Sequence, residues 1–176
     1  MRLLALLLAL WVVVAQAQTY PNKAIRLVVP FAPGGSSSLV ARSVAAEMSK
    51  ALGYEIYIEN KGGGGGNLAM NDVAHADPDG YTLIIGHVGS LAMTPLMEKN
   101  LGYDVNRDFA PVSLLAKVPN IFVVHESVPA KNLREFVALA KKEPGKLNYG
   151  SAGNGSAGHL AMEYLKLVSG MELQHV

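Results

Sequence analysis

Apolar and polar positions along the chain follow two periods, one typical of strands and the other of helices. Short apolar runs predict buried strands, whereas apolar positions three and four apart predict amphipathic helices. The predicted strands are 25–29, 54–59, 81–86, 147–149, two runs within 109–124, and a strand that begins in 171–176. The predicted helices are 39–52, 68–75, 93–98, 133–142 and 158–168. Repeated strand–loop–helix units indicate an α/β protein with a mostly parallel sheet.

Three loops rich in Gly, Ser or Thr follow predicted strands, at 31–38, 87–94 and 151–159. In a parallel sheet such loops lie beyond the carboxyl ends of the strands, where ligands bind. Their glycines let a ligand approach the backbone amides, their serines can cap the next helix, and a helix N-terminus favours an anion. One such loop alone would be only a tight turn, but three on one rim favour a ligand site.

The segment Gly153-x-Gly155-x-x-Gly158, between a predicted strand and a predicted helix, matches the dinucleotide-binding fingerprint. That fingerprint also needs an acidic residue about 20 positions later, at the end of the next strand. The chain shows Gln174 and His175 there, and several strands precede the motif, so nucleotide binding is disfavoured. The run 62–66 is not a P-loop, because no Gly-Lys-Ser/Thr follows it, and it is predicted to be a flexible connection.

Catalytic and metal chemistry find little support in the pattern. Ser156 and His159 can share a helix face, but Asn154 replaces the first glycine of a nucleophile elbow. We therefore predict Ser156 to be a cap or ligand donor and His159 to be a structural residue of the first helical turn. The five histidines are scattered and the chain has no cysteine, so no catalytic residue, metal or cofactor is expected.

The N-terminus has the three parts of a secretory signal peptide. Arg2 precedes the apolar run 3–15, and Ala15-Gln16-Ala17 supplies the small residues of a cleavage site. A 13-residue run is too short to cross about 30 Å of hydrocarbon as a helix. We expect an exported protein that begins at Gln18 and that meets little free NAD or ATP. It would carry 14 basic and 14 acidic residues without a basic stripe, which disfavours nucleic-acid binding.

Several short motifs, in order along the chain, resemble one family. They are Tyr20-Pro21-x-Lys23-x-Ile25-Arg26, Val29-Pro30-Phe31-Ala32-Pro33-Gly34-Gly35, Glu59-Asn60-Lys61, Gly65-Gly66-Asn67, Pro78-Asp79-Gly80-Tyr81-Thr82-Leu83, Asp108-Phe109-Ala110-Pro111-Val112 and Pro144-Gly145-Lys146-Leu147-Asn148-Tyr149. From Tyr20 to Val176 the chain resembles the tripartite tricarboxylate transporter substrate-binding proteins, also called Bug receptors.

The resemblance implies a periplasmic binding protein-like α/β fold with two lobes, here 18–124 and a partial second lobe at 125–176, after a signal peptide at 1–17. It implies a monomeric periplasmic receptor that closes on a small carboxylate and docks on a membrane permease of two unequal subunits. In the family, water molecules commonly bridge the ligand and the loop amides. The ligand-binding residues would be Phe31, Ala32, Pro33, Gly34, Gly35, Ser36, Ser37, Ser38, Ser90, Ser151, Gly153, Asn154, Gly155 and Ser156.

The chain departs from the family in three ways. Ser38 stands where the family usually has Asp, which suggests a site for acids without an ammonium group. Leu91 replaces a usual His, which suits an aromatic or longer acid. Family members are also much longer, so we expect a C-terminal truncation that leaves the second lobe incomplete and the chain prone to aggregation. A non-functional receptor fragment, a periplasmic sensor and an esterase-like enzyme remain alternatives.

Overall fold

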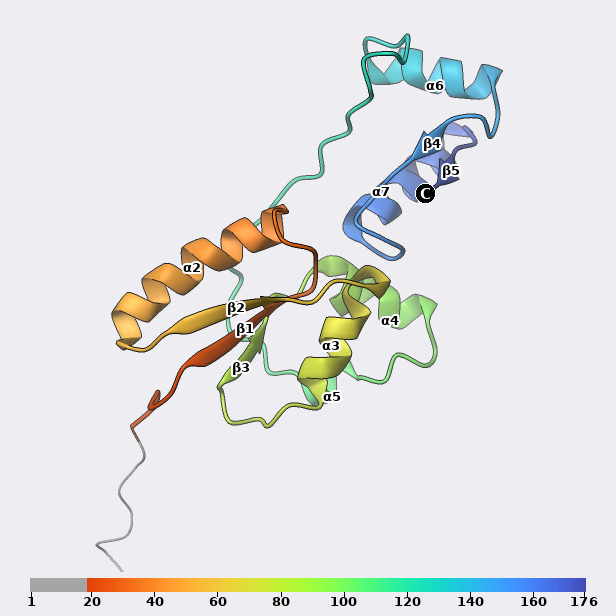
Figure 1. Cartoon of the computed structure of the whole chain (residues 1–176). Helices are drawn as coiled ribbons and strands as arrows, with labels where there is room; N and C mark the ends of the chain where they lie inside the picture. Colours follow the sequence, from red (N-terminus) through yellow and green to blue (C-terminus); the bar gives the residue numbers. More distant parts are fainter. Residues whose placement is uncertain (1–18) are drawn as a thin grey trace, which may run out of the picture.

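The structure, a computed structural model, describes residues 19–176, and the predicted signal peptide lies outside this range. The chain forms two lobes, each with its own parallel sheet and its own buried cluster of apolar side chains (Figure 1). The first lobe has a three-stranded sheet of order β2-β1-β3, and the second lobe has the pair β4-β5. The prediction of an α/β fold with parallel strands is confirmed.

The elements follow one another closely in each lobe. In the first lobe they are β1 (Ile25–Val29), α2 (Ser36–Leu52), β2 (Ile56–Asn60), a 3₁₀ turn (Gly64–Gly66), α3 (Asn67–Ala74), β3 (Thr82–Ile84), a π-helical turn (Gly89–Met93), α4 (Thr94–Met97) and α5 (Val105–Asp108). In the second lobe they are α6 (Leu133–Lys142), β4 (Asn148–Tyr149), α7 (Ala157–Ser169) and β5 (Gln174–His175). Most predicted elements lie within a few residues of these bounds, and α6 matches its predicted range.

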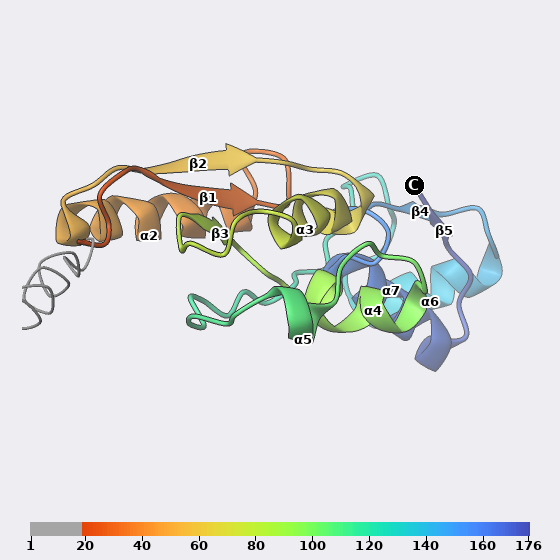
Figure 2. The same cartoon turned by 90° about the horizontal axis from the view of Figure 1, so that it is seen from below.

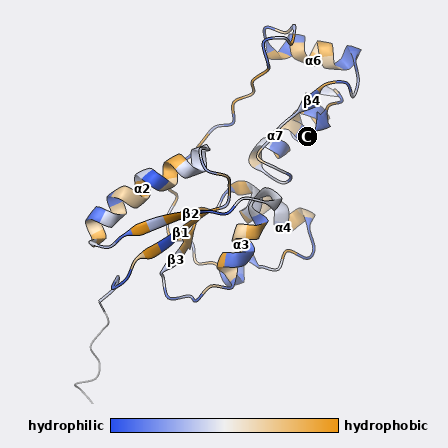
Figure 3. Ribbon diagram, viewed as in Figure 1, coloured by the Kyte–Doolittle hydropathy of each residue, from blue (hydrophilic) through white to orange (hydrophobic). Residues whose placement is uncertain are grey.

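The core of the first lobe lies between α2 and one face of the sheet. Side chains alternate across a strand, so Ile25, Leu27 and Val29 all point to this face, where they pack against Ala41 and Ala45 of α2. Both alanines repeat at helical spacing and are buried, which brings the helix backbone close to the sheet. Figure 3 shows the apolar residues concentrated in the strands of this sheet.

The opposite face of the sheet carries an ionic cluster covered by α3. Arg26 of β1 donates to Glu59 of β2 and to Asp72 of α3, each over 2.7 Å, and Lys61 also pairs with Asp72 at 2.7 Å. Hydrogen bonding to Lys61 and then to Arg26 holds the pKa of the Asp72 carboxyl below its ordinary value. The cluster joins three elements and fixes α3 on the sheet, which positions the loop before it.

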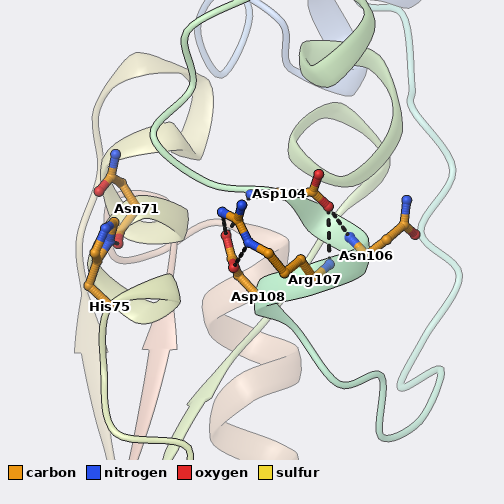
Figure 4. Close-up of polar contacts among 6 residues, drawn as sticks. All are labelled: Asn71, His75, Asp104, Asn106, Arg107 and Asp108. Carbon is orange, nitrogen blue, oxygen red and sulfur yellow. Dashed lines mark hydrogen bonds and ion pairs between the residues drawn. The ribbon is translucent and has the colours of Figure 1, made fainter.

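A short helix that the sequence did not suggest closes the first lobe. The side chain of Asp104 accepts hydrogen bonds from the backbone amides of Asn106 and Arg107 and so caps α5 (Figure 4). Nearby, Asn71 of α3 donates from its side chain to the carbonyl of Leu101 at 3.1 Å. These local contacts hold the turn that carries Tyr103, whose hydroxyl donates to the carbonyl of Ser90.

The second lobe packs α6 and α7 against the β4-β5 pair. Its buried cluster consists of Phe136, Ala140, Tyr149, Met162, Met171 and Leu173. Gly170 ends α7 in the left-handed conformation, as a glycine after a helix commonly does. Its backbone amide donates to the backbone carbonyl of Lys166. Figures 1 and 2 show this lobe grouped at one end of the molecule, apart from the β2-β1-β3 sheet.

The prediction of two strands within 109–124 is wrong, because this segment forms neither helix nor strand. It runs as an extended connection from α5 to the second lobe (Figure 1). A strand needs a neighbour for its backbone hydrogen bonds, and no described segment pairs with this one. Most of its large apolar side chains are exposed, among them Val112 and Ile121. Within residues 19–176, no helix has the length and apolar character needed to span a bilayer.

Candidate functional site

The first candidate loop, 31–38, joins β1 to α2 and leaves the start of α2 open. Gly35 is the N-cap residue, and it offers no side chain to the amides of the first turn. The prediction that a serine of this loop caps the helix is therefore wrong for α2. Gly34 has a φ of 99°, a left-handed conformation that turns the chain into the helix and that glycine adopts without strain. The stretch 32–36 is exposed, and no side chain of the N-cap residue pairs with the amides that begin α2, which leaves these amides to a ligand.

Ser38 is buried in the first turn of α2 and has a structural partner. Its hydroxyl accepts a hydrogen bond from the Asn60 side-chain amide at 2.7 Å, and the same amide donates to the carbonyl of Phe31 at 2.9 Å. Asn60 thus ties both ends of the loop to the end of β2. Asn60 was not among the predicted site residues, although it belongs to the Glu59-Asn60-Lys61 motif.

The loop at 87–94 forms a tight π-helical turn that buries its serine. Ser90 is fully buried, with its hydroxyl 3.4 Å from the carbonyl of His87 and its own carbonyl accepting from the Tyr103 hydroxyl at 2.9 Å. Burial lowers the pKa of His87. A neutral ring with its proton on Nε2 fits both neighbours, because Nε2 lies 3.2 Å from the carbonyl of Gly65 and Nδ1 accepts from the amide of Gly89.

The second-lobe loop, 151–156, is arranged around two serines before α7. Ser156 is the N-cap residue of α7, and its hydroxyl accepts from the amide of His159 at 3.3 Å. The predictions of Ser156 as a cap and of His159 as a residue of the first turn are confirmed. Ser151 accepts from the amide of Gly153 at 3.1 Å and lies 2.8 Å from Nε2 of His175. The loop is therefore held mainly by hydroxyl and histidine contacts.

The glycine run 62–66 is where the two lobes meet. Gly65 and Gly66 are buried, and every residue from Gly63 to Gly66 has a positive φ, so the run is a defined turn rather than the predicted flexible connection. A methyl group on Gly65 would overlap the carbonyl oxygen of Asn154. Figure 1 shows the loop before α7 beside the turn before α3.

Two further contacts bring the candidate loops together. A methyl group on Gly89 would overlap the carbonyl oxygen of Gly155, so the turn at 89–93 also touches the second-lobe loop. The first loop joins this group through Phe31, whose ring lies 4.6 Å from that of His87. The structure thus links all three predicted loops through His87, which was not among the predicted ligand-binding residues, and through the glycine run, which was predicted to be only a flexible connection. Backbone contact at glycines leaves no apolar pattern that could have revealed them.

The chemistry offered by these loops is neutral hydrogen bonding to an anion. None of the three loops contains Lys or Arg. Exposed amides at the start of α2, helped by the helix dipole, are suited to a carboxylate. No three of the histidine and carboxylate side chains in residues 19–176 gather in a way that could hold a metal ion. Two open hollows on the described surface are lined largely by other segments, at 124–135 and at 91–106.

The chain matches the family model described as the tripartite tricarboxylate transporter family receptor, over residues 40–176. The match covers most of the chain. The chain belongs to this receptor family. Its members are periplasmic solute-binding receptors, and the resemblance seen in the sequence motifs is confirmed. A UPF0065 protein of Bordetella pertussis is 41% identical over 162 residues, which are 92% of this chain and 50% of the relative.

Two solved structures that are similar to this chain are described with a carboxylate. One is a Rhodopseudomonas palustris protein, Rpa4515, described with adipate; it is 39% identical, with a TM-score of 0.86 over 89% of this chain and 52% of its own. The other is MatC of the same organism, described with bound malate, at 39% identity and a TM-score of 0.84 over 89% of this chain and 53% of its own. The chain spans about half the length of these relatives.

Proposed function

We propose that this receptor-family protein binds a small carboxylate between its two lobes and delivers it to the membrane permease of a tripartite tricarboxylate transporter. The observation that carries the proposal is the open start of α2, where exposed residues lead into a helix without a side-chain cap, beside the contact between the lobes. A carboxylate at this helix start would accept several hydrogen bonds and would be favoured by the helix dipole.

The proposed site is built from all three loops, of which the first and the third supply the ligand contacts. The first loop, 31–38, would supply amides and hydroxyls, and Ser151, Gly153, Asn154, Gly155 and Ser156 would supply the facing group. Ser90 would act through its buried hydroxyl by shaping the turn. Because the loops lack basic side chains, selection would rest on amides, hydroxyls and bridging water rather than on a salt bridge.

The resemblance supports the remaining parts of this proposal. We place the first lobe at 18–124, the second at 125–176 and the signal peptide at 1–17, with export to the periplasm. Carboxylates are the ligands named for the two related structures, so adipate and malate are the first compounds to test. No catalytic group and no cofactor take part in this function.

The test is calorimetric titration of the chain with adipate, malate and matched monocarboxylic acids, together with a Gly35→Asp variant. Gly35 has an extended backbone and open space beside it, so Asp fits there and becomes a strong helix cap. We expect Gly35→Asp to keep or raise thermal stability while it weakens carboxylate binding at least about tenfold, because its charge occupies the helix start.

Gly35→Ala is the matched control, since it adds a side chain without charge or capping oxygen. It should bind much more tightly than Gly35→Asp. Absence of carboxylate binding by the unaltered chain, or equal binding by Gly35→Asp, would contradict the proposed site.

A further inference from the structure

Two histidines lie side by side behind the second-lobe loop, in a cluster that the proposed function leaves unused. His159 belongs to the first turn of α7 and His175 to β5, and their ring centroids are 4.4 Å apart. The ring of Tyr149 on β4 lies 4.8 Å from that of His175 and 6.4 Å from that of His159. Three elements of the second lobe therefore place these rings next to residues 151–156.

Each histidine makes one hydrogen-bond contact with the loop. Nδ1 of His159 accepts from the amide of Gly155 at 3.2 Å, and Nε2 of His175 lies 2.8 Å from the hydroxyl of Ser151. The Ser151 hydroxyl also accepts a hydrogen bond from the backbone amide of Gly153, and it lies 3.2 Å from the carbonyl oxygen of the same residue. One histidine thus holds each end of the turn.

These contacts require particular protonation states. Nδ1 of His159 can accept only when the ring is neutral with its proton on Nε2. Burial, and then the charge of neighbouring His175, lower the pKa of His159, which favours the neutral ring. If Nε2 of His175 donates to Ser151, the serine hydroxyl is free to donate to the carbonyl of Gly153.

The charged groups around the pair are already engaged with other partners. Glu163 accepts from the Tyr149 hydroxyl at 2.5 Å and from Lys166 at 2.7 Å. Its carboxylate therefore has its own donors, and neither histidine is paired with it by a hydrogen bond. The two rings are directed at the loop.

We propose that His159 and His175 are positioning residues, which hold the turn 151–156 in the shape that accepts a carboxylate. The inference rests on the proposed function for its consequence in binding, but the hydrogen bonds themselves can be tested without a ligand. The histidines act through Ser151 and Gly155 and are not assigned contact with the ligand.

The binding test replaces each histidine in two ways in the full chain. His159→Phe and His175→Phe keep an aromatic ring but remove the loop contact. His159→Asn and His175→Gln restore an acceptor in place of Nδ1 and a donor in place of Nε2. We expect each Phe variant to bind adipate about five- to tenfold more weakly, and the polar variants to recover most of the affinity. His125→Phe, on the exposed connection, is the control and should bind as the unaltered chain does.

The second measurement is the tautomer of each ring, recorded in the unaltered chain without ligand by long-range ¹H–¹⁵N NMR. We expect both neutral rings to carry the proton on Nε2. Because this measurement needs no variant, it tests the inference even if the Phe variants do not fold. A proton on Nδ1 of His159 would overturn the inference, as would Phe variants that bind normally or polar variants as weak as the Phe variants. Failure of the unaltered chain to bind any carboxylate, with the expected tautomers present, would instead reject the proposed function.

Discussion

Among single residues, Ser38 is the position at which a substitution would bring a negative charge into the proposed site. Its buried hydroxyl lies in the first turn of α2 and accepts from Asn60, so an Asp there would also find a donor and a favourable helix dipole. We expect Ser38→Asp to fold, to weaken adipate binding by about tenfold or more, and to gain affinity for amino acids, whose ammonium group it can pair with.

Titration calorimetry with adipate and with glutamate measures both effects. Ser43→Asp places the same charge on an exposed position of the same helix and serves as the control. Unchanged affinity of Ser38→Asp for glutamate would contradict the idea that Ser38 selects acids without an ammonium group.

Prediction from sequence succeeded for some residues and failed for others for identifiable reasons. The cap at Ser156 was predictable, because a serine preceded a clear helical pattern. The cap of α2 was not, because Gly35 and three serines follow one another and all can begin a helix. The choice depends on the left-handed turn at Gly34 and on the contact of Ser38 with Asn60, both of which are set by the fold.

Among the elements, the 3₁₀ turn Gly64–Gly66 connects the fold to the site. A methyl group on Gly65 would overlap the second-lobe carbonyl of Asn154, whereas one on Gly64 would meet only Asn67 of its own lobe, at 3.8 Å. Both glycines have left-handed φ values, 63° and 55°, so alanine costs a similar backbone strain of about 1–2 kcal/mol at each. A comparison of alanine at Gly64 with alanine at Gly65 therefore separates the effect of backbone strain from the effect of blocking the contact with Asn154.

We therefore expect Gly65→Ala and Gly64→Ala to lose similar thermal stability but to differ in binding. Gly65→Ala should weaken adipate binding at least about tenfold more than Gly64→Ala, because only Gly65→Ala keeps the lobes from meeting. Thermal unfolding and titration of both variants test this expectation. Equal affinities would show that contact at Gly65 plays no part in ligand capture.

Elements were predictable where the pattern reports local burial. Strand β1 is an apolar run buried on both faces and helix α6 buries one regular face, and the bounds of both follow from the sequence. The segment 109–124 has an equally strong strand pattern but lacks a neighbouring strand in the described chain, so its backbone stays unpaired. The apolar pattern indicated that this segment can form strands. Whether it does so depends on a neighbouring strand with which its backbone can pair.

At the scale of the whole molecule, the two lobes have separate cores and touch through the candidate loops. The chain spans about half the length of its relatives, and its connection between the lobes exposes several large apolar side chains. Val112 is 85% exposed and Ile121 is 81% exposed, within one segment that pairs with no strand of the described chain. Such a surface favours association between chains.

The monomer expected from the family resemblance therefore depends on this segment being covered. We expect the chain 19–176 by itself to associate with rising concentration, as measured by sedimentation velocity, and Ile121→Lys to weaken that association about tenfold or more. Leu96→Lys tests the alternative that any exposed apolar residue acts alike, because Leu96 is 82% exposed but lies on α4. A chain that remains monomeric at high concentration, or equal effects of Ile121→Lys and Leu96→Lys, would mean that the connection is not the surface through which chains associate. A selective effect of Ile121→Lys would instead explain why a segment with a strand pattern is unpaired here: it pairs only when another chain segment lies beside it.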